Sequence, residues 1–154
     1  MDSSFIRKYL ESLTPQLFSF AYALIPDDLQ AQQIVLDAYS LFFLKEQELE
    51  KEDAILFNIL CHVYKLGTKR LGQLEGSLSL PTTTPHGVIS SQFYQLTITQ
   101  RGILYLSHHL ELDSHKMAII LGVSVGSISQ LLHSARGRFL DSIGMGQELE
   151  SIVS

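Results

Sequence analysis

The chain has little cysteine and little charge, and both shortages restrict what it can be. Its 154 residues include one cysteine, Cys61, which excludes an internal disulfide framework and a zinc site built from several cysteines. No apolar run reaches the roughly 18 residues of a membrane span, and the first residues lack the positive start of a secretory signal. Charged residues make up 18% and hydrophobic residues 45%, enough for one folded domain or two small ones. We therefore expect a folded, cytoplasmic protein.

Positive charge is especially scarce. Eleven Lys and Arg residues stand against sixteen Asp and Glu residues, which gives a net charge of -5. This balance argues against strong binding of duplex DNA, because neutralisation of phosphates by Lys and Arg supplies most of the non-specific affinity. Residues 1–75 hold seven basic and eleven acidic residues, whereas residues 96–140 hold four basic and two acidic ones. The later segment is thus the positive part of the chain, and mildly so.

Apolar residues recur at helical spacing through the first part of the chain. They predict a helix over residues 5–25, which Pro15 is expected to divide or to restart. A second helix is expected after Pro26, capped by Asp27 or Asp28. This second helix is apolar over much of its circumference, which predicts packing on more than one side.

A third helix is predicted over residues 54–66, with Gly67 as its end. Three basic residues gather near this end: Lys65, Lys69 and Arg70. They form either a contact for nucleic acid or an acidic partner, or cations that the helix dipole favours at a C-terminus. The second explanation requires no function.

Gly, Ser, Thr and Pro dominate the middle of the chain and predict a linker over residues 72–92. This linker separates a first helical domain, residues 1–71, from a second one, residues 93–143, and residues 144–154 follow as a tail. No strand pattern competes with the helical one. The predicted fold is therefore all-α, with an N-terminal helical bundle and a C-terminal helix-turn-helix domain.

The helix-turn-helix prediction rests on residues 121–136, LGVSVGSISQLLHSAR. Gly122 is expected to make the turn, and Ser124 to cap a last helix that ends near Ile143. Such a motif places its second helix in the major groove of DNA.

Two helices are expected before this turn. The first is capped by Thr97 or Thr99 and runs to Leu110. The second is short, covers residues 116–121 and is capped by Ser114.

In this order of elements the chain resembles bacterial sigma factors of the extracytoplasmic-function type. Such factors carry a Leu-Thr/Pro-x-x-Gln-Arg motif, an apolar helix, and an Ala-x-x-Leu-Gly-Val-Ser-Val-Gly-Thr-Val run. The matching positions are Leu96, Thr97, Gln100 and Arg101, then Ile103, Leu104 and Leu106, then Ala118, Leu121, Gly122, Val123, Ser124, Val125, Gly126, Ser127 and Ile128. More loosely, residues 27–43 resemble the helix that binds the polymerase clamp, and residues 54–70 the helix that opens the downstream promoter element.

The resemblance implies three partners: the RNA polymerase core, promoter DNA and an anti-sigma factor. The residues that it implies for DNA contact are Ser124, Ser127, Ser129, Gln130, His133, Arg136 and Arg138. The residues that it implies for contact with polymerase or another protein partner are Gln33, Leu36, Asp37 and Leu131.

The chain departs from the family's pattern where charge or polarity is expected. Ser129, Leu131 and Ser134 occupy positions of the last helix that are usually basic, and Gln33 and Leu36 replace polar members of the clamp-binding helix. The loss of three phosphate contacts weakens DNA binding on the order of ten- to a thousand-fold. An apolar residue on an exposed recognition face, as at Leu131, marks a protein contact, unless that face packs within this chain.

Two functions therefore stay open. The chain is either a sigma-factor-like transcription regulator that acts through RNA polymerase and promoter DNA, or a mimic that binds an anti-sigma factor or polymerase without reading DNA. An enzyme is not expected, because no acid–base or nucleophile arrangement appears at a suitable spacing. No metal or cofactor is expected either, because adjacent histidines such as His108 and His109 face different ways on a helix and no acid pair or cysteine completes a site.

Overall fold

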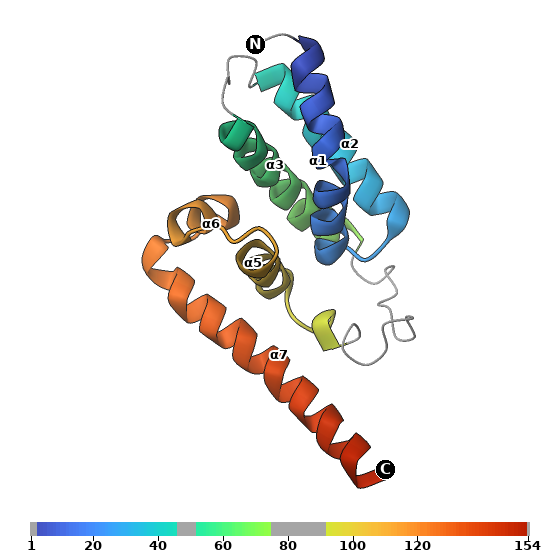
Figure 1. Ribbon diagram of the computed structural model, residues 1–154, viewed down its shortest axis with the longest axis vertical. Helices are drawn as coiled ribbons and strands as arrows, with labels where there is room; N and C mark the ends of the chain where they lie inside the picture. The colour runs from blue at the N-terminus through green and yellow to red at the C-terminus, as the bar shows by residue number, and fades with distance from the viewer. Residues whose placement is uncertain (1–2, 46–51, 75–91, 154) are drawn as a thin grey trace. The chain divides into compact units, whose positions relative to one another are not determined.

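The structure is a computed structural model that describes residues 3–45, 52–74 and 92–153. For residues 3, 45, 52, 53 and 141–153 the description covers the backbone. All the regular elements within these residues are helices (Figure 1). The all-α prediction is confirmed.

Contacts divide the chain into two compact units, Met1–Ser77 and Leu78–Ser154. The first unit comprises α1 (Ser3–Leu24), α2 (Asp28–Lys45) and α3 (Glu52–Gln73), and each of these helices contacts the other two (Figure 1). Their facing sides bury large apolar side chains, which supply most of the stabilisation of such a bundle. The most deeply buried are Leu17, Phe20, Leu24, Ile25, Ile34, Phe42, Ile55, Ile59 and Leu60.

Helix α1 is continuous through Pro15, so the prediction that Pro15 divides it is wrong. A proline inside a helix removes one backbone hydrogen bond and costs about 3 kcal/mol. Pro15 is exposed, whereas Leu10, Leu13 and Leu17 around it are buried on the opposite side. Their burial holds both halves of α1 against the core and outweighs the local cost.

Side chains fix where α2 begins and how it attaches to α1. Asp27 is the cap, because its Oδ1 accepts from the backbone N–H of Gln30 at 2.9 Å. The Tyr39 hydroxyl donates to the carbonyl oxygen of Leu10 at 2.9 Å and lies 2.6 Å from Thr14 Oγ1. Burial raises the pKa of Tyr39 above its ordinary value, against a smaller opposing effect of Thr14. The hydroxyl therefore stays protonated and keeps α2 joined to α1 at neutral pH.

Helix α3 continues past Gly67 to Gln73, so the prediction that Gly67 ends it is wrong. Gly67 is buried at a close approach between α3 and α1. A Cβ atom placed there would lie 3.0 Å from Cδ1 and 3.4 Å from Cβ of Leu24. A glycine at this position lets α3 approach α1 closely, because no side chain stands between the two helices.

We expect the two glycines near the end of α3 to respond oppositely to substitution. Gly67→Ile should destabilise the first unit by about 1–3 kcal/mol, because the added atoms collide with Leu24. Gly72→Ala should stabilise it by up to about 1 kcal/mol, since nothing lies within 4 Å of a Cβ there and alanine favours the helix. Urea unfolding followed by circular dichroism measures both, and a Gly67→Ile variant as stable as the parent chain would refute the close approach.

The second unit comprises α5 (Ile98–His108), α6 (Ser114–Leu121) and α7 (Val125–Val153) (Figure 1). Each of these helices contacts the other two. Their shared core is smaller than that of the first unit. Its most deeply buried apolar side chains are Ile103, Leu106, Ile128 and Ala135.

The starts of α5 and α6 are defined by caps. Thr97 forms a capping box with Gln100: each side chain bonds to the backbone N–H of the other. Asp113 caps α6, because its Oδ1 accepts from the N–H of Lys116 at 2.9 Å. The prediction of Ser114 as this cap is wrong by one residue, since the extended backbone that a cap requires lies at Asp113 and Ser114 is already helical.

Other boundaries also differ from those expected. Helix α3 begins at Glu52 instead of Ala54, and α5 ends at His108 instead of Leu110. Helix α7 continues past Ile143 to Val153. Residues 72 and 73 of the predicted linker belong to α3, and residues 75–91 lie outside the described part, so the extent of the linker stays a prediction.

Among the described residues, no single helix is long and apolar enough to cross a membrane. Helix α6 and the first part of α7 reach that length and composition as a pair, but the pair is sharply bent.

Candidate nucleic-acid interface

The turn between α6 and α7 sets these helices nearly at right angles. Gly122 has φ 70° and ψ 34°, a left-handed conformation, and its N–H bonds to the carbonyl oxygens of Ala118 and Ile119. The N–H of Val123 also donates to Ala118, at 3.0 Å. Three residues separate α6 from α7, which leaves at an angle of 89° to α6. A short glycine turn between helices at this angle is the geometry of a helix-turn-helix.

One face of α7 is buried in the second unit and the opposite face is open. Ile128 and Ala135 lie seven residues apart, hence on one side of the helix, and both are buried. Ala118 and Leu121 of α6 are buried as well. The exposed residues at the start of α7 are Ser124, Val125, Gly126, Ser129, Gln130, His133 and Ser134. Apart from Val125 and Gly126, the side chains of this open face are polar.

Most of the residues implied for DNA contact are exposed: Ser124, Ser129, Gln130, His133, Arg136 and Arg138. Ser127 differs, because it is half-buried and its hydroxyl donates to the carbonyl oxygen of Ser124 at 2.7 Å. That hydroxyl helps to close the first turn of α7. Gln130 and His133 offer hydrogen-bonding groups of the kind that contact base edges.

Both arginines of α7 contact α5. Arg136 Nε donates to His108 Nε2 at 3.3 Å and its Nη2 to Ser107 Oγ at 3.5 Å. Arg138 Nη1 donates to Gln100 Oε1 at 3.3 Å. These contacts are long and exposed, so each contributes little stability and exchanges readily for a stronger acceptor.

The open face of α7 carries no Lys or Arg before Arg136. Ser129 and Ser134 are exposed where sigma factors usually place basic residues. Leu131, implied as a protein contact, is half-buried and therefore presents part of its side chain. The face is suited to hydrogen bonding and poor in the charge that holds a duplex in register.

Arg101, which ends the motif that begins at Leu96, is a buried residue of the second unit. Arg101 is 5% exposed, and its Nη1 donates to the carbonyl oxygen of Leu96. Its Cζ lies 5.7 Å from the ring centroid of Tyr94. Burial lowers the pKa of this guanidinium, while Tyr94 raises it, and an arginine stays charged under such conditions. Arg101 therefore binds the segment before α5 to that helix and is not available to DNA.

We expect Arg101→Leu to destabilise the second unit by about 2–3 kcal/mol, because it leaves the buried Leu96 carbonyl without this donor. Arg101→Lys should recover less than half of the loss, since an ammonium group lacks the planar fork. The exposed Arg138→Leu is the matched control and should change stability by less than about 0.5 kcal/mol. Thermal unfolding provides the comparison, and equal effects at the two arginines would contradict a structural role for Arg101.

In the first unit, Gln33 and Asp37 belong to a polar network that links α2 and α3. Asp37 Oδ2 pairs with Arg70 Nη2 at 3.0 Å, and its Oδ1 accepts from Gln33 Nε2 at 2.9 Å. Arg70 Nη1 also donates to Gln30 Oε1 at 2.9 Å. Arg70 is thus engaged within the unit, while Lys65 and Lys69 are exposed. Of the three basic residues near the end of α3, two therefore present their charge to solvent, and the charge of Arg70 is paired with Asp37.

The outer face of α2 carries exposed apolar residues among polar ones such as Gln33 and Ser40. Leu29, Leu36 and Phe43 follow one another at intervals of seven residues and are 76%, 58% and 47% exposed; we call them the α2 stripe. The interval places all three along one side of the helix. The expectation that α2 packs on more than one side is confirmed, because α2 contacts both α1 and α3. The described residues leave the α2 stripe itself open.

The histidine and cysteine residues that the structure describes do not gather into a site. His108 accepts from Arg136, whereas the ring of His109 stacks on that of Tyr105, with centroids 4.5 Å apart. Cys61 is half-buried. Within the described part of the chain, no group of three His, Cys, Asp or Glu residues is placed to hold a metal ion.

No family model matches the sequence, and no curated protein does. The comparison of structures does find a similar fold: the sigma factor RpoE of Bartonella quintana, solved in complex with the anti-sigma factor NepR. Its TM-score with this chain is 0.70, the match covers 90% of this chain and 96% of that one, and the sequences are 18% identical. The resemblance inferred from the motifs is therefore confirmed at the level of the fold.

Proposed function

We propose that the chain is a sigma-factor-like regulator that acts in transcription initiation through RNA polymerase and promoter DNA, in the cytoplasm. The observation that carries this proposal is the pair α6 and α7, set at 89° by a three-residue turn with an open polar face on α7. A fold shared with a sigma factor over 90% of the chain supports it.

In this proposal α7 faces the promoter. Gln130 and His133 contact base edges, together with Ser129, since glutamine pairs with adenine through two hydrogen bonds. The start of α7 next to Ser124 offers backbone N–H groups to a phosphate, while the N–H and hydroxyl of Ser127 bond to the Ser124 carbonyl and hold this turn in shape. Arg136 and Arg138 exchange their long contacts with α5 for phosphates. Few cations take part, so the affinity for DNA is low and the polymerase supplies most of the binding.

The proposed polymerase contact is α2, with Gln33, Leu36 and Asp37 at its centre. Arg70 holds Asp37 in place and Asp37 in turn holds Gln33, so both side chains lose little conformational entropy on binding. Leu36 lies on the α2 stripe and buries apolar area against the partner. Leu131 offers a second, smaller apolar contact from α7.

The shortage of positive charge favours a second candidate. The exposed Lys and Arg residues of the second unit are Lys116, Arg136 and Arg138. The scarcity of cations disfavours DNA binding, and the exposed α2 stripe favours binding to a protein. Both features support a sigma-factor mimic that binds an anti-sigma factor without reading DNA. RpoE itself was solved with an anti-sigma factor bound.

A salt titration of DNA binding separates the two candidates. A sigma-like regulator should bind promoter-length duplexes with an affinity that falls steeply with salt. The double variant Arg136→Ala/Arg138→Ala should lower the slope of log affinity against log salt by about two, because two phosphate contacts are lost. Fluorescence anisotropy, with and without core polymerase, provides the measurement.

The matched control is Arg7→Ala/Lys8→Ala, which removes the same charge from exposed positions of α1. It should leave the slope unchanged. Absence of DNA binding even at low salt and with polymerase present, together with tight binding of an anti-sigma factor, would establish the mimic instead.

Leu36→Glu should weaken binding to core polymerase by at least about 1 kcal/mol, because it places an unpaired charge at the centre of an apolar contact. Leu36 is exposed, so the fold should be unaffected. Ser19→Glu adds the same charge at an exposed position of α1 and should bind like the parent chain. Equal affinities of both variants in a surface-binding assay would exclude α2 as the docking helix.

A further inference from the structure

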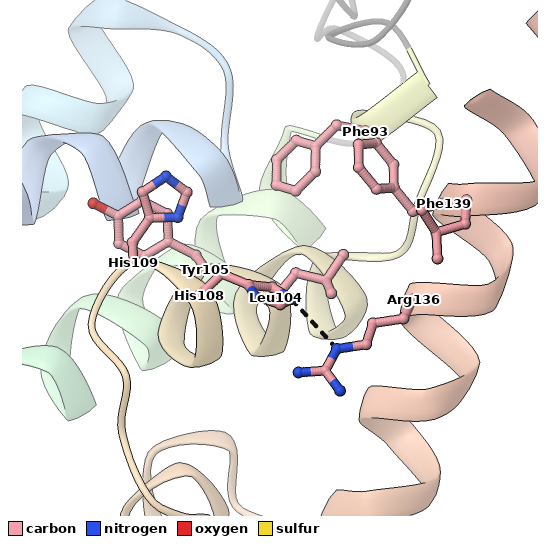
Figure 2. A pocket seen from close by; sticks show the side chains of 8 residues that line it. Phe93, Leu104, Tyr105, His108, His109, Arg136 and Phe139 are labelled. Carbon is pink, nitrogen blue, oxygen red and sulfur yellow. Dashed lines mark hydrogen bonds between the residues drawn. The ribbon is translucent and has the colours of Figure 1, made fainter. Parts of the chain in front are cut away.

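The second unit contains a groove of about 430 Å³ between α5, α7 and the residues that precede α5 (Figure 2). Phe93 and Phe139 form one side, edge to face, with ring centroids 6.1 Å apart. The stacked rings of Tyr105 and His109 lie on another side, and Leu104 lies between the two pairs. The lining is almost entirely apolar. Sites that bind small molecules have volumes in this range and linings of this kind.

One cation stands at the rim of this groove. Arg136 lines it with the apolar part of its side chain, and its guanidinium, beside the apolar wall, contacts His108 and Ser107, neither of which is an acid. Among the residues whose side chains are described, no carboxylate lies within ion-pair distance of Arg136. The groove thus combines an apolar interior with a positive charge that no described acid neutralises.

We propose that this groove binds a small amphipathic carboxylic acid, with an apolar body and a single carboxylate. The body lies among Phe93, Leu104 and Phe139, where it displaces water from apolar surface. The carboxylate replaces His108 as the acceptor for Arg136, whose planar fork donates two parallel hydrogen bonds to such a group.

The shape of the groove favours a small molecule over a protein helix. A docked helix inserts a row of side chains, spaced along several of its turns, into a long groove. Here there is a single recess, bounded on one side by Phe93 and Phe139 and on another by Tyr105 and His109. The site goes beyond the proposed function, and it does not depend on whether α7 reads DNA.

Decanoate and decanol, which share a hydrocarbon chain and differ in charge, test the proposal. The full-length protein is titrated with each by isothermal calorimetry, below the concentration at which decanoate forms micelles. Decanoate should bind at least about tenfold more tightly, because hydrogen bonds to a charged group contribute this much. Equal affinities, or no binding of decanoate, would overturn the proposal.

Variants locate the bound carboxylate. Arg136→Ala should remove the preference for decanoate over decanol, whereas Arg138→Ala should keep it. Arg138 lies two residues away on α7 and also contacts α5, but it does not line the groove. A preference that survives in Arg136→Ala would show that the carboxylate binds elsewhere and would overturn the proposal.

A third variant places a negative charge at the groove itself. Leu140 lines the groove and is 62% exposed, so Leu140→Asp should fold normally while it repels the carboxylate. Decanoate affinity should fall by about tenfold and decanol affinity less. Circular dichroism confirms that each variant is folded, and an unchanged decanoate affinity in a folded Leu140→Asp protein would refute the site.

Discussion

The left-handed backbone of Gly122 determines the direction in which α7 leaves α6, and the candidate interface follows from that direction. A residue with a side chain pays about 1–2 kcal/mol to adopt this conformation. Once the turn is made, Ile128 and Ala135 enter the core of the second unit, and the side of α7 that bears Gln130 and His133 is left open. The polar face is therefore a consequence of the turn together with the burial opposite to it.

A second feature of the chain is that four of its arginines form contacts with other residues of the fold. Arg70 joins α3 to α2 through Asp37, and the buried Arg101 joins α5 to the segment that precedes it. Arg136 and Arg138 contact α5. A chain with few cations has thus placed most of its arginines in internal contacts. This explains how a helix-turn-helix geometry coexists with a weakly charged surface.

The sequence predicted those parts of the structure that depend on local chemistry. Helical spacing located the helices, and the need for a left-handed residue at a tight turn identified Gly122. The errors at Pro15 and Gly67 have a common cause, because both residues oppose a helix locally and are overruled by packing. At Pro15 the burial of Leu10, Leu13 and Leu17 on the other side of α1 prevails, and at Gly67 the close approach to Leu24 does.

The candidate site was less accessible to prediction. Arg101 belongs to a motif visible in the sequence, but its burial depends on Tyr94 and the Leu96 carbonyl meeting it in space. The groove is formed by residues of α5 and α7 that lie some thirty positions apart, and no pattern within either helix indicates it. The roles of Gln33, Leu36, Asp37 and Leu131 in partner binding stay predictions.

The spacing of the α2 stripe has a geometric consequence. Side chains repeated every seven residues drift by about 20° per repeat around a straight α-helix, because seven residues fall short of two full turns. The line through Leu29, Leu36 and Phe43 is therefore slightly oblique to the axis of α2. A helix lying along that line would cross α2 at a shallow angle of about 20° and wind around it with a left-handed twist.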